Sequence, residues 1–249
     1  MVEASKRLER LNMSYIGNYE NMIVKFLEQG YKPTEFGIAL TGKRELISRH
    51  DIDFDCSAAL SIALTEKALG VSSTYFFMLS SSFYNVVHDE VRETIKKIAA
   101  LGHTISVHFD PTIYQDLERG LQMEIDIFES IFKVDIKTIS IHRPNDFFLN
   151  HDKPICGVEH TYQFKYFKDI KYISDSQGAF RYEDPIDNKS FTNKKSIQLL
   201  THPIWWEKDS RTNIHAIERF IKRTEKNKKH QIALNCAPYK ERFENEFKK

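Results

Sequence analysis

Short apolar runs rich in β-branched and aromatic residues alternate with amphipathic segments along most of this chain, and this alternation limits the folds it can adopt. Such runs predict strands, and apolar residues that recur every three or four positions predict the helices between them. The predicted strands cover residues 46–53, 71–79, 103–109, 138–142, 172–174, 197–200 and 231–236. The predicted helices cover residues 58–69, 87–98, 117–132 and 214–221, and residues 177–195 are predicted to form a loop. About seven strands that alternate with helices predict an α/β fold with a parallel sheet, either open or closed into a barrel.

Length and composition indicate one soluble domain. The chain has 249 residues, and we expect a single domain with a helical lead-in over residues 1–45 and the main fold over residues 46–240. A hydrophobic fraction of 41% with 29% charged residues is ordinary for a soluble globular protein. The three cysteines are widely spaced, so neither a zinc knuckle nor a disulfide framework is predicted.

The charge balance and the apolar runs also bear on partners and location. A formal net charge of +1 gives no global electrostatic argument for a nucleic-acid partner. No apolar run approaches the length of a membrane span. The first residues lack the apolar stretch of a signal peptide, so we expect a cytoplasmic protein.

The segment from Arg49 to Asp53 carries the densest group of reactive side chains, at the end of the first predicted strand. Side chains alternate faces along a strand, so Asp51 and Asp53 project the same way. Two carboxylates at so short a distance repel each other unless a cation lies between them or one of them is protonated. We interpret the pair as one metal ligand and one general base. A solvated turn in which Asp55 caps the following helix is the alternative.

Further polar residues fall at the C-terminal ends of other predicted strands: His108, His142, Arg143, Asp175 and His202. In a barrel these strand ends form one rim, where active sites gather. An arginine at the rim could hold a carboxylate with both nitrogens, and we expect Arg143 to hold Asp51 in this way. Asp175 could act in catalysis or simply end a turn. His103 lies an odd number of positions from His108 and should face the other side, so we expect it to be structural.

Aromatic residues near these strand ends are candidates for substrate contacts. Trp205 and Trp206 follow His202, and an aromatic face can cover the apolar side of a sugar ring. Phe83 and Tyr84 are further candidates. Burial of the two tryptophans in the core is an equally open alternative.

In the order of these motifs, the sequence resembles the polysaccharide deacetylases, family 4 of the carbohydrate esterases. The resemblance runs from about Arg49 to Trp206 and is nearest to a branch that reads Arg-His-Asp-x-Asp. It rests on Arg49–Asp53, Gly70–Phe77, Gly102–His108, Ile141–Pro144, Tyr172–Ser176 and Leu200–Pro203. The resemblance implies a deformed (β/α) barrel with an Asp-His-His metal site. It further implies that Asp51 resembles the catalytic base, Asp53 and His108 metal ligands, Arg143 the arginine that holds the base, and His202 the general acid.

Two departures from the family pattern affect the expected metal site. Ile52 separates the two aspartates, which are usually adjacent, and Thr112 occupies the position of the second metal-binding histidine. Threonine is a poor zinc ligand, so another residue must complete the site. We expect His142 to do so, with Asp110 as the second candidate.

The resulting hypothesis is a metal-dependent hydrolase that removes an N-acetyl group from an amino sugar or a surface-polysaccharide precursor. Its cofactor would be a divalent metal, zinc above all, with cobalt or nickel as other choices. Two alternatives stay open: a barrel that binds carbohydrate without chemistry, and a hydrolase of a small-molecule amide that is not a sugar.

Overall fold

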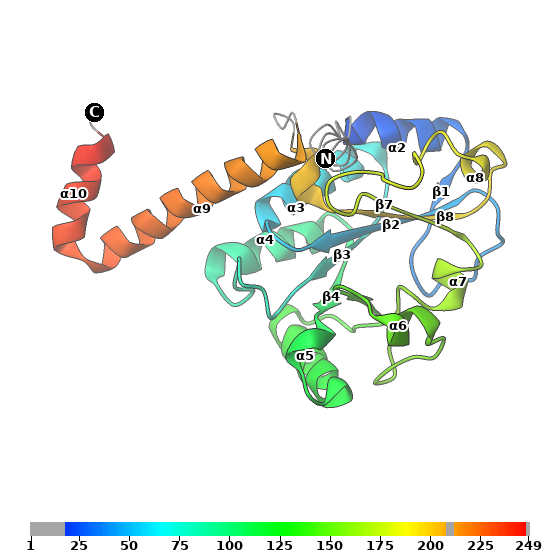
Figure 1. The fold of residues 1–249 in the computed structure, drawn as a ribbon, viewed down its shortest axis with the longest axis horizontal. Coiled ribbons are helices and arrows are strands. Elements are labelled where there is room, and N and C mark those ends of the chain that lie inside the picture. Colours follow the sequence, from blue (N-terminus) through cyan, green and yellow to red (C-terminus); the bar gives the residue numbers. More distant parts are fainter. Residues whose placement is uncertain (1–17, 208–211, 248–249) are drawn as a thin grey trace, which may run out of the picture.

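The computed structural model describes residues 18–207 and 212–247 (Figure 1). Its strands are β1 (Lys32–Pro33), β2 (Glu45–Ile52), β3 (Thr74–Phe77), β4 (Thr104–Phe109), β5 (Thr138–Ile141), β6 (Glu159–His160), β7 (Lys171–Ser174) and β8 (Ile197–Thr201). The longer helices are α2 (Tyr19–Glu28), α3 (Cys56–Leu69), α4 (Asp89–Ala100), α5 (Leu117–Phe132), α9 (Asn213–Asn235) and α10 (Ala237–Phe247). The short ones are η1 (Pro111–Ile113), α6 (Asp146–Asn150), α7 (Phe164–Phe167), α8 (Lys189–Thr192) and η2 (Pro203–Trp206).

All of the strand pairings are parallel and join the strands into one curved sheet. The order is β6-β5-β4-β3-β2-β8-β7, and the short β1 pairs with the start of β2. Parallel neighbours require crossover connections, which the helices supply on the outside of the sheet (Figure 1). The predicted α/β fold, a deformed (β/α) barrel of about seven parallel strands, is therefore confirmed.

The two faces of the sheet differ in chemistry, and β2 shows why. All eight of its residues are buried, and alternate side chains face opposite sides. Leu46 and Ile52 join a large apolar cluster with side chains of α3, α4 and α5, which cover the convex face. The concave face instead carries Arg49 and Asp51, which bind each other inside the barrel. The side of β2 that carries the Arg49–Asp51 pair thus lines the interior and leads to the site.

The barrel is open between β6 and β7, the two ends of the strand order, which do not pair with each other in the described part of the chain. The fully buried side chain of Gln198 bridges this opening from β8. Its amide donates to the carbonyl oxygens of Thr161, at 3.2 Å, and Tyr166, at 2.7 Å. These bonds satisfy two backbone acceptors at the opening, one after β6 and one in α7.

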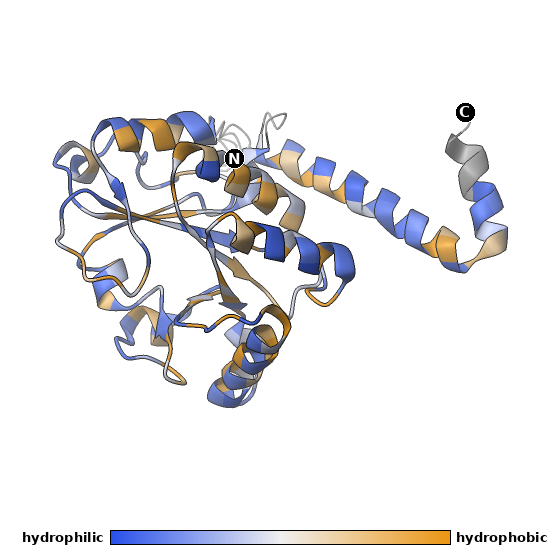
Figure 2. Ribbon diagram, turned by 180° about the vertical axis from the view of Figure 1, so that it is seen from behind, coloured by the Kyte–Doolittle hydropathy of each residue, from blue (hydrophilic) through white to orange (hydrophobic). Residues whose placement is uncertain are grey.

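The C-terminal part of the chain differs from expectation. Residues 231–236 are predicted as a closing strand, but residues 231–235 belong to α9, a helix of 23 residues that runs away from the barrel and ends at Cys236 (Figures 1 and 2). No glycine or proline interrupts the sequence from Asn213 until Pro238, so nothing stops the helix where the strand was expected. The alternation of Ile232 and Leu234 favoured a strand, but both side chains are exposed on the helix. Among the helices of the described ranges, none combines the length and apolar character needed to cross a membrane.

Candidate active site and metal centre

A pocket of about 720 Å³ opens at the C-terminal ends of the strands. The expected site residues that line it are Asp51, Asp53, His108, Asp110, His142, Arg143, His202 and Trp205. All but Trp205 come from β2, β4, β5 and β8 or from the residue or two that follow these strands, and Trp205 lies in η2, just after β8. Parallel topology brings all of these strand ends to one rim, so residues distant in sequence share one cavity.

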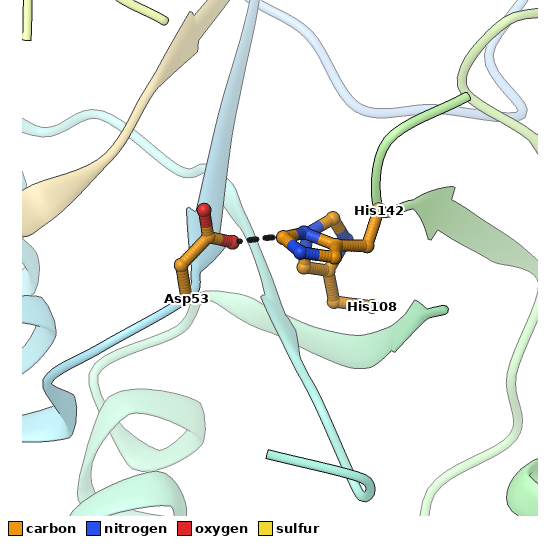
Figure 3. A group of neighbouring side chains, drawn as sticks. All are labelled: Asp53, His108 and His142. Carbon is orange, nitrogen blue, oxygen red and sulfur yellow. Dashed lines mark hydrogen bonds and ion pairs between the residues drawn. The ribbon is translucent and has the colours of Figure 1, made fainter. Parts of the chain in front are cut away.

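Three of the lining residues form a cluster that could hold a metal ion (Figure 3). His108 Nε2 lies 3.1 Å from Asp53 Oδ1 and 3.1 Å from His142 Nδ1. His142 Nδ1 and Asp53 Oδ1 are 3.4 Å apart. In Figure 3 the three side chains point toward one another from different strand ends. The structure thus brings together the three residues expected to bind the metal.

The spacing of these donor atoms fits a transition-metal ion. Metal–ligand bonds of about 2.0–2.1 Å in a tetrahedral site separate neighbouring ligand atoms by about 3.3–3.4 Å. Two imidazole nitrogens and one carboxylate oxygen are a donor set suited to zinc and to its neighbours cobalt and nickel. Burial favours the neutral acid, but the adjacent imidazoles of His108, His142 and His202 outweigh it and hold the pKa of Asp53 well below its usual range. Asp53 is therefore an anionic ligand at neutral pH.

Thr112 and Asp110 do not belong to this cluster in the described part of the chain. Thr112 lies in η1, and its backbone N and hydroxyl both donate to Asp110 Oδ1, at 2.9 and 2.6 Å. Asp110 therefore caps the short helix with Oδ1. His142 occupies the place in the cluster that the sequence left open.

Asp51 lies deeper in the barrel than the metal cluster and is held by Arg49. The guanidinium donates from Nε to Asp51 Oδ1 at 2.9 Å and from Nη2 to Oδ2 at 2.6 Å. Ser140 adds a bond to Oδ1 at 2.9 Å. Burial favours the neutral acid, but Arg49 outweighs it, and the pKa of Asp51 is lowered. Oδ2 is 3.8 Å from His108 Nε2, so this oxygen faces the metal cluster.

This arrangement differs from the expectation that Arg143 holds Asp51. Arg49 lies two residues before Asp51 on the same strand, so both side chains face the barrel interior. Arg143 is exposed and takes a left-handed backbone conformation, with φ of 52°, immediately after His142. Arg143 lines the pocket but makes no ion pair or hydrogen bond with a side chain of residues 18–207 or 212–247. The bidentate clamp expected from Arg143 is therefore provided by Arg49.

His202 and Asp175 form a second pair at the rim. Asp175 is fully buried, and its Oδ1 lies 2.6 Å from His202 Nδ1. The other nitrogen of His202, Nε2, is 3.9 Å from Asp53 Oδ2 and thus faces the metal cluster. Burial favours the neutral imidazole, but the carboxylate of Asp175, with smaller contributions from Asp53 and Asp51, raises the pKa of His202 to about 9. Because of this pairing, His202 is protonated at neutral pH.

Two aromatic residues expected to contact substrate have structural positions instead. Tyr84 accepts from the backbone N of Met78 at 2.7 Å and donates to the carbonyl of Ile52 at 2.6 Å, so it fastens the ends of β2 and β3 together. Trp206 is buried, and its indole Nε1 donates to Asp175 Oδ2 at 2.7 Å. Both side chains use their polar atoms inside the protein, which removes them from the pocket wall.

Phe83 and Trp205 do line the pocket. Phe83 is 51% exposed, and its ring packs against Phe54 with centroids 5.1 Å apart. Trp205 also packs against Phe54, at a centroid distance of 6.1 Å. Together these three rings form an aromatic wall at the pocket mouth.

Arg49 and Ser140 are the two site residues that the sequence reasoning missed. Both could be found from strand alternation, because Arg49 shares a face with Asp51, and Ser140 shares a face with His142. The same alternation places His103 on the convex side, where its Nε2 lies 2.9 Å from the carbonyl of Ala63. The expectation of a structural His103 agrees with this position.

No protein-family model and no curated protein matches this sequence. Solved structures do match, among them a peptidoglycan deacetylase from Bacillus subtilis that is 14% identical, with 76% of this chain and 86% of that chain covered and a TM-score of 0.45. A family 4 carbohydrate esterase from Bacillus anthracis is 15% identical, with 87% of this chain and 89% of that chain covered and a TM-score of 0.43. A family 4 pseudoenzyme from Bacillus anthracis is 14% identical, with 79% of this chain and 66% of that chain covered and a TM-score of 0.42. The solved structures that match therefore include members of family 4 of the carbohydrate esterases. This is also the family that the order of the sequence motifs resembles.

Proposed function

We propose that this protein is a metal-dependent hydrolase that removes the N-acetyl group of an amino sugar or of a precursor of a surface polysaccharide. The observation that carries the proposal is the Asp53-His108-His142 cluster, whose donor atoms are 3.1–3.4 Å apart. Asp51, 3.8 Å from His108, and His202, 3.9 Å from Asp53, supply a base and an acid beside that cluster. Hydrolysis of an amide needs both, because water must lose a proton and the amine must gain one.

The residues have distinct roles in this proposal. A divalent ion held by Asp53, His108 and His142 would supply Lewis-acid polarisation of a carbonyl oxygen and activation of water. Asp51 is the general base: Arg49 keeps it ionised, and its Oδ2 faces the site as the proton acceptor. His202 is the general acid: its Nε2 faces the site and gives a proton to the leaving amine.

Asp175 is a positioning residue in this scheme. Its carboxylate accepts from His202 Nδ1 and from the backbone N of His202, which fixes the ring orientation and directs Nε2 to the pocket. The indole of Trp206 holds the second oxygen of the same carboxylate. The arrangement keeps an imidazolium available where a leaving amine would form.

The aromatic wall supports a carbohydrate as the substrate. Phe54, Phe83 and Trp205 present ring faces and edges next to the polar cluster. A sugar ring has apolar C–H faces and a polar rim, which suits a pocket of this mixed character. The exposed guanidinium of Arg143 at the same mouth offers donors to sugar hydroxyls or to an anionic group linked to the sugar.

Metal content is the first test. We expect the purified protein, loaded with zinc and then desalted, to retain about one ion per chain by mass spectrometry, and the His142→Ala variant to lose it. Loss of one of three protein ligands removes a large part of the affinity. His88→Ala is the matched control, because the side chain of His88 is exposed and makes no capping hydrogen bond. Retention of the ion by His142→Ala would exclude His142 as a ligand.

Acetate release from a panel of N-acetylated amino sugars, free and nucleotide-linked, tests the activity. We expect release that falls as the pH rises through the pKa of His202, which is about 9 in the metal-free site. A cation at Asp53 lowers this value, so the fall in the loaded protein is expected below pH 9. Simple acetamides in the same panel test the alternative of a non-sugar amide hydrolase. Sugar binding without acetate release from the zinc-loaded protein would instead indicate a barrel that has lost its chemistry.

A further inference from the structure

Ser140 connects the proposed base to the proposed metal cluster. It lies on β5, is fully buried, and stands opposite His108 in the β4–β5 register. Its hydroxyl oxygen is 2.7 Å from Arg49 Nη2, 2.9 Å from Asp51 Oδ1 and 2.8 Å from His108 Nδ1. One oxygen therefore contacts the clamp, the base and a metal-site histidine together.

The chemistry of these three neighbours determines where the hydrogen atoms lie. Arg49 can only donate, and an ionised Asp51 can only accept. The single hydrogen of the Ser140 hydroxyl must therefore point to Asp51, since otherwise two oxygens would face each other at 2.9 Å without a hydrogen between them. The hydroxyl oxygen is then free to accept from His108, so the hydrogen-bond network assigns the proton of that ring to Nδ1.

This assignment leaves a lone pair on His108 Nε2, the atom that points at Asp53 and His142. We propose that Ser140 is a positioning residue that holds His108 in the tautomer able to bind a metal through Nε2 and, with the same hydroxyl, orients Asp51. The inference rests on the proposed function, because it assumes that the cluster binds a divalent ion. It goes further by assigning the residue that couples the ligand to the base.

Ser106 provides an internal comparison. It lies on β4, two residues before His108 and thus on the same face, and it is also buried. Its hydroxyl donates to the carbonyl oxygen of Thr138 at 2.6 Å, and it contacts none of the site residues through a hydrogen bond that involves residues 18–207 or 212–247. Ser106→Ala therefore removes a buried hydroxyl from the same barrel interior without changing the site. A purely structural role for Ser140 predicts that the two alanine variants behave alike.

Zinc affinity, measured by competition with a chromophoric chelator, tests the proposal without any substrate. We expect Ser140→Ala to bind zinc about 10–100-fold more weakly than the wild type, since loss of a hydrogen-bond partner behind a metal-binding histidine typically has an effect of that size. Ser106→Ala is expected to bind zinc as the wild type does. Ser140→Thr, which keeps the hydroxyl, is expected to recover most of the affinity, and its unfolding curve checks that the added methyl group is accommodated.

The second readout is the Nδ1 proton of His108 in NMR spectra of the isotope-labelled, zinc-loaded protein. We expect a slowly exchanging, hydrogen-bonded proton in the wild type and in Ser106→Ala, and its loss by rapid exchange in Ser140→Ala. Equal zinc affinities in the two alanine variants, together with an unchanged proton signal, would overturn the proposal. Failure of the proposed function is separate: it would appear as a wild-type protein that binds zinc through this cluster and releases no acetate.

Discussion

We expect Glu66→Ala to lower the free energy of unfolding by about 3–5 kcal/mol, the loss typical when one partner of a buried charged network is removed. Glu66 lies on α3, is fully buried, and accepts four hydrogen bonds behind the active-site strands. Its Oε1 accepts from Tyr19 at 2.6 Å and Ser73 at 2.6 Å and lies 3.0 Å from His50 Nε2, and its Oε2 accepts from Tyr75 at 2.5 Å. Alanine would leave all four groups buried without an acceptor.

The position of this cluster explains why its loss should affect the whole molecule. Tyr19 comes from α2, His50 from β2 and Tyr75 from β3, so the carboxylate of Glu66 connects four elements. Burial and the charge of Glu66 both raise the pKa of Tyr19 and of Tyr75, so these phenols remain neutral donors. His50 also lies 2.7 Å from Thr201 through Nδ1, which extends the network to β8.

The same network predicts a dependence of stability on pH. Burial favours the neutral acid, but His50 and the hydroxyl donors outweigh it and lower the pKa of Glu66 in the folded protein. A folded pKa below the unfolded value of about 4.3 means that the contribution is complete above that value and is lost as the pH falls through the folded pKa. Glu66→Gln should therefore be less stable than the wild type at pH 7 and should lose less stability on acidification.

Denaturant unfolding at pH 7 and at several lower pH values measures both effects. Glu28→Gln is the matched control: it changes an exposed glutamate at the end of α2, and we expect a change within about 0.5 kcal/mol. A Glu66→Ala protein as stable as this control would mean that water or a rearrangement satisfies the four groups. The importance assigned to the network would then be wrong.

The fold was largely predictable because the convex face of the sheet follows simple hydrophobic patterns. The strands around Ile105 and Ile139 and the helix of Leu121 and Phe128 have the periodicities that their burial requires. The concave face was harder to predict, because its polar residues form hydrogen bonds with one another rather than with water. Which arginine meets Asp51 depends on strand alternation and on the turn after His142, and composition cannot distinguish Arg49 from Arg143.

The metal cluster was likewise predictable only in part. The sequence could identify Asp53, His108 and His142 as candidates, since all three lie at strand ends, but it left Asp110 open as an alternative to His142. The position of His142 depends on the three-dimensional register, in which its backbone N donates to the carbonyl of Phe109 at 2.7 Å and brings it beside β4. The strand predicted for residues 231–236 was wrong for a different reason: a local alternation was present, but the segment continues α9 as far as Asn235 and is not one of the strands of the described sheet.

Asp51→Asn is expected to lower kcat about 10²–10⁴-fold, the range that general acid–base catalysis usually contributes, while KM and the zinc content stay near the wild-type values. Asparagine keeps the shape of the side chain but cannot accept the proton of water. Acetate release under saturating substrate and mass spectrometry of the same zinc-loaded preparation give the two measurements. Full turnover in a variant that retains zinc would remove Asp51 as the base.

Interpretation of that variant requires a separate measure of the damage to the Arg49 pair, because asparagine leaves a fully buried guanidinium without its anion. Arg49→Lys provides it: the charge remains, but the planar fork that binds both oxygens of Asp51 is lost. If Asp51 acts mainly as a base, Arg49→Lys should be destabilised yet keep more activity than Asp51→Asn at a temperature where both remain folded. If Asp51 serves only to neutralise Arg49, the activities of the two variants should instead follow their stabilities. The ratio of kcat between two folded, zinc-loaded variants therefore separates a catalytic carboxylate from a structural one.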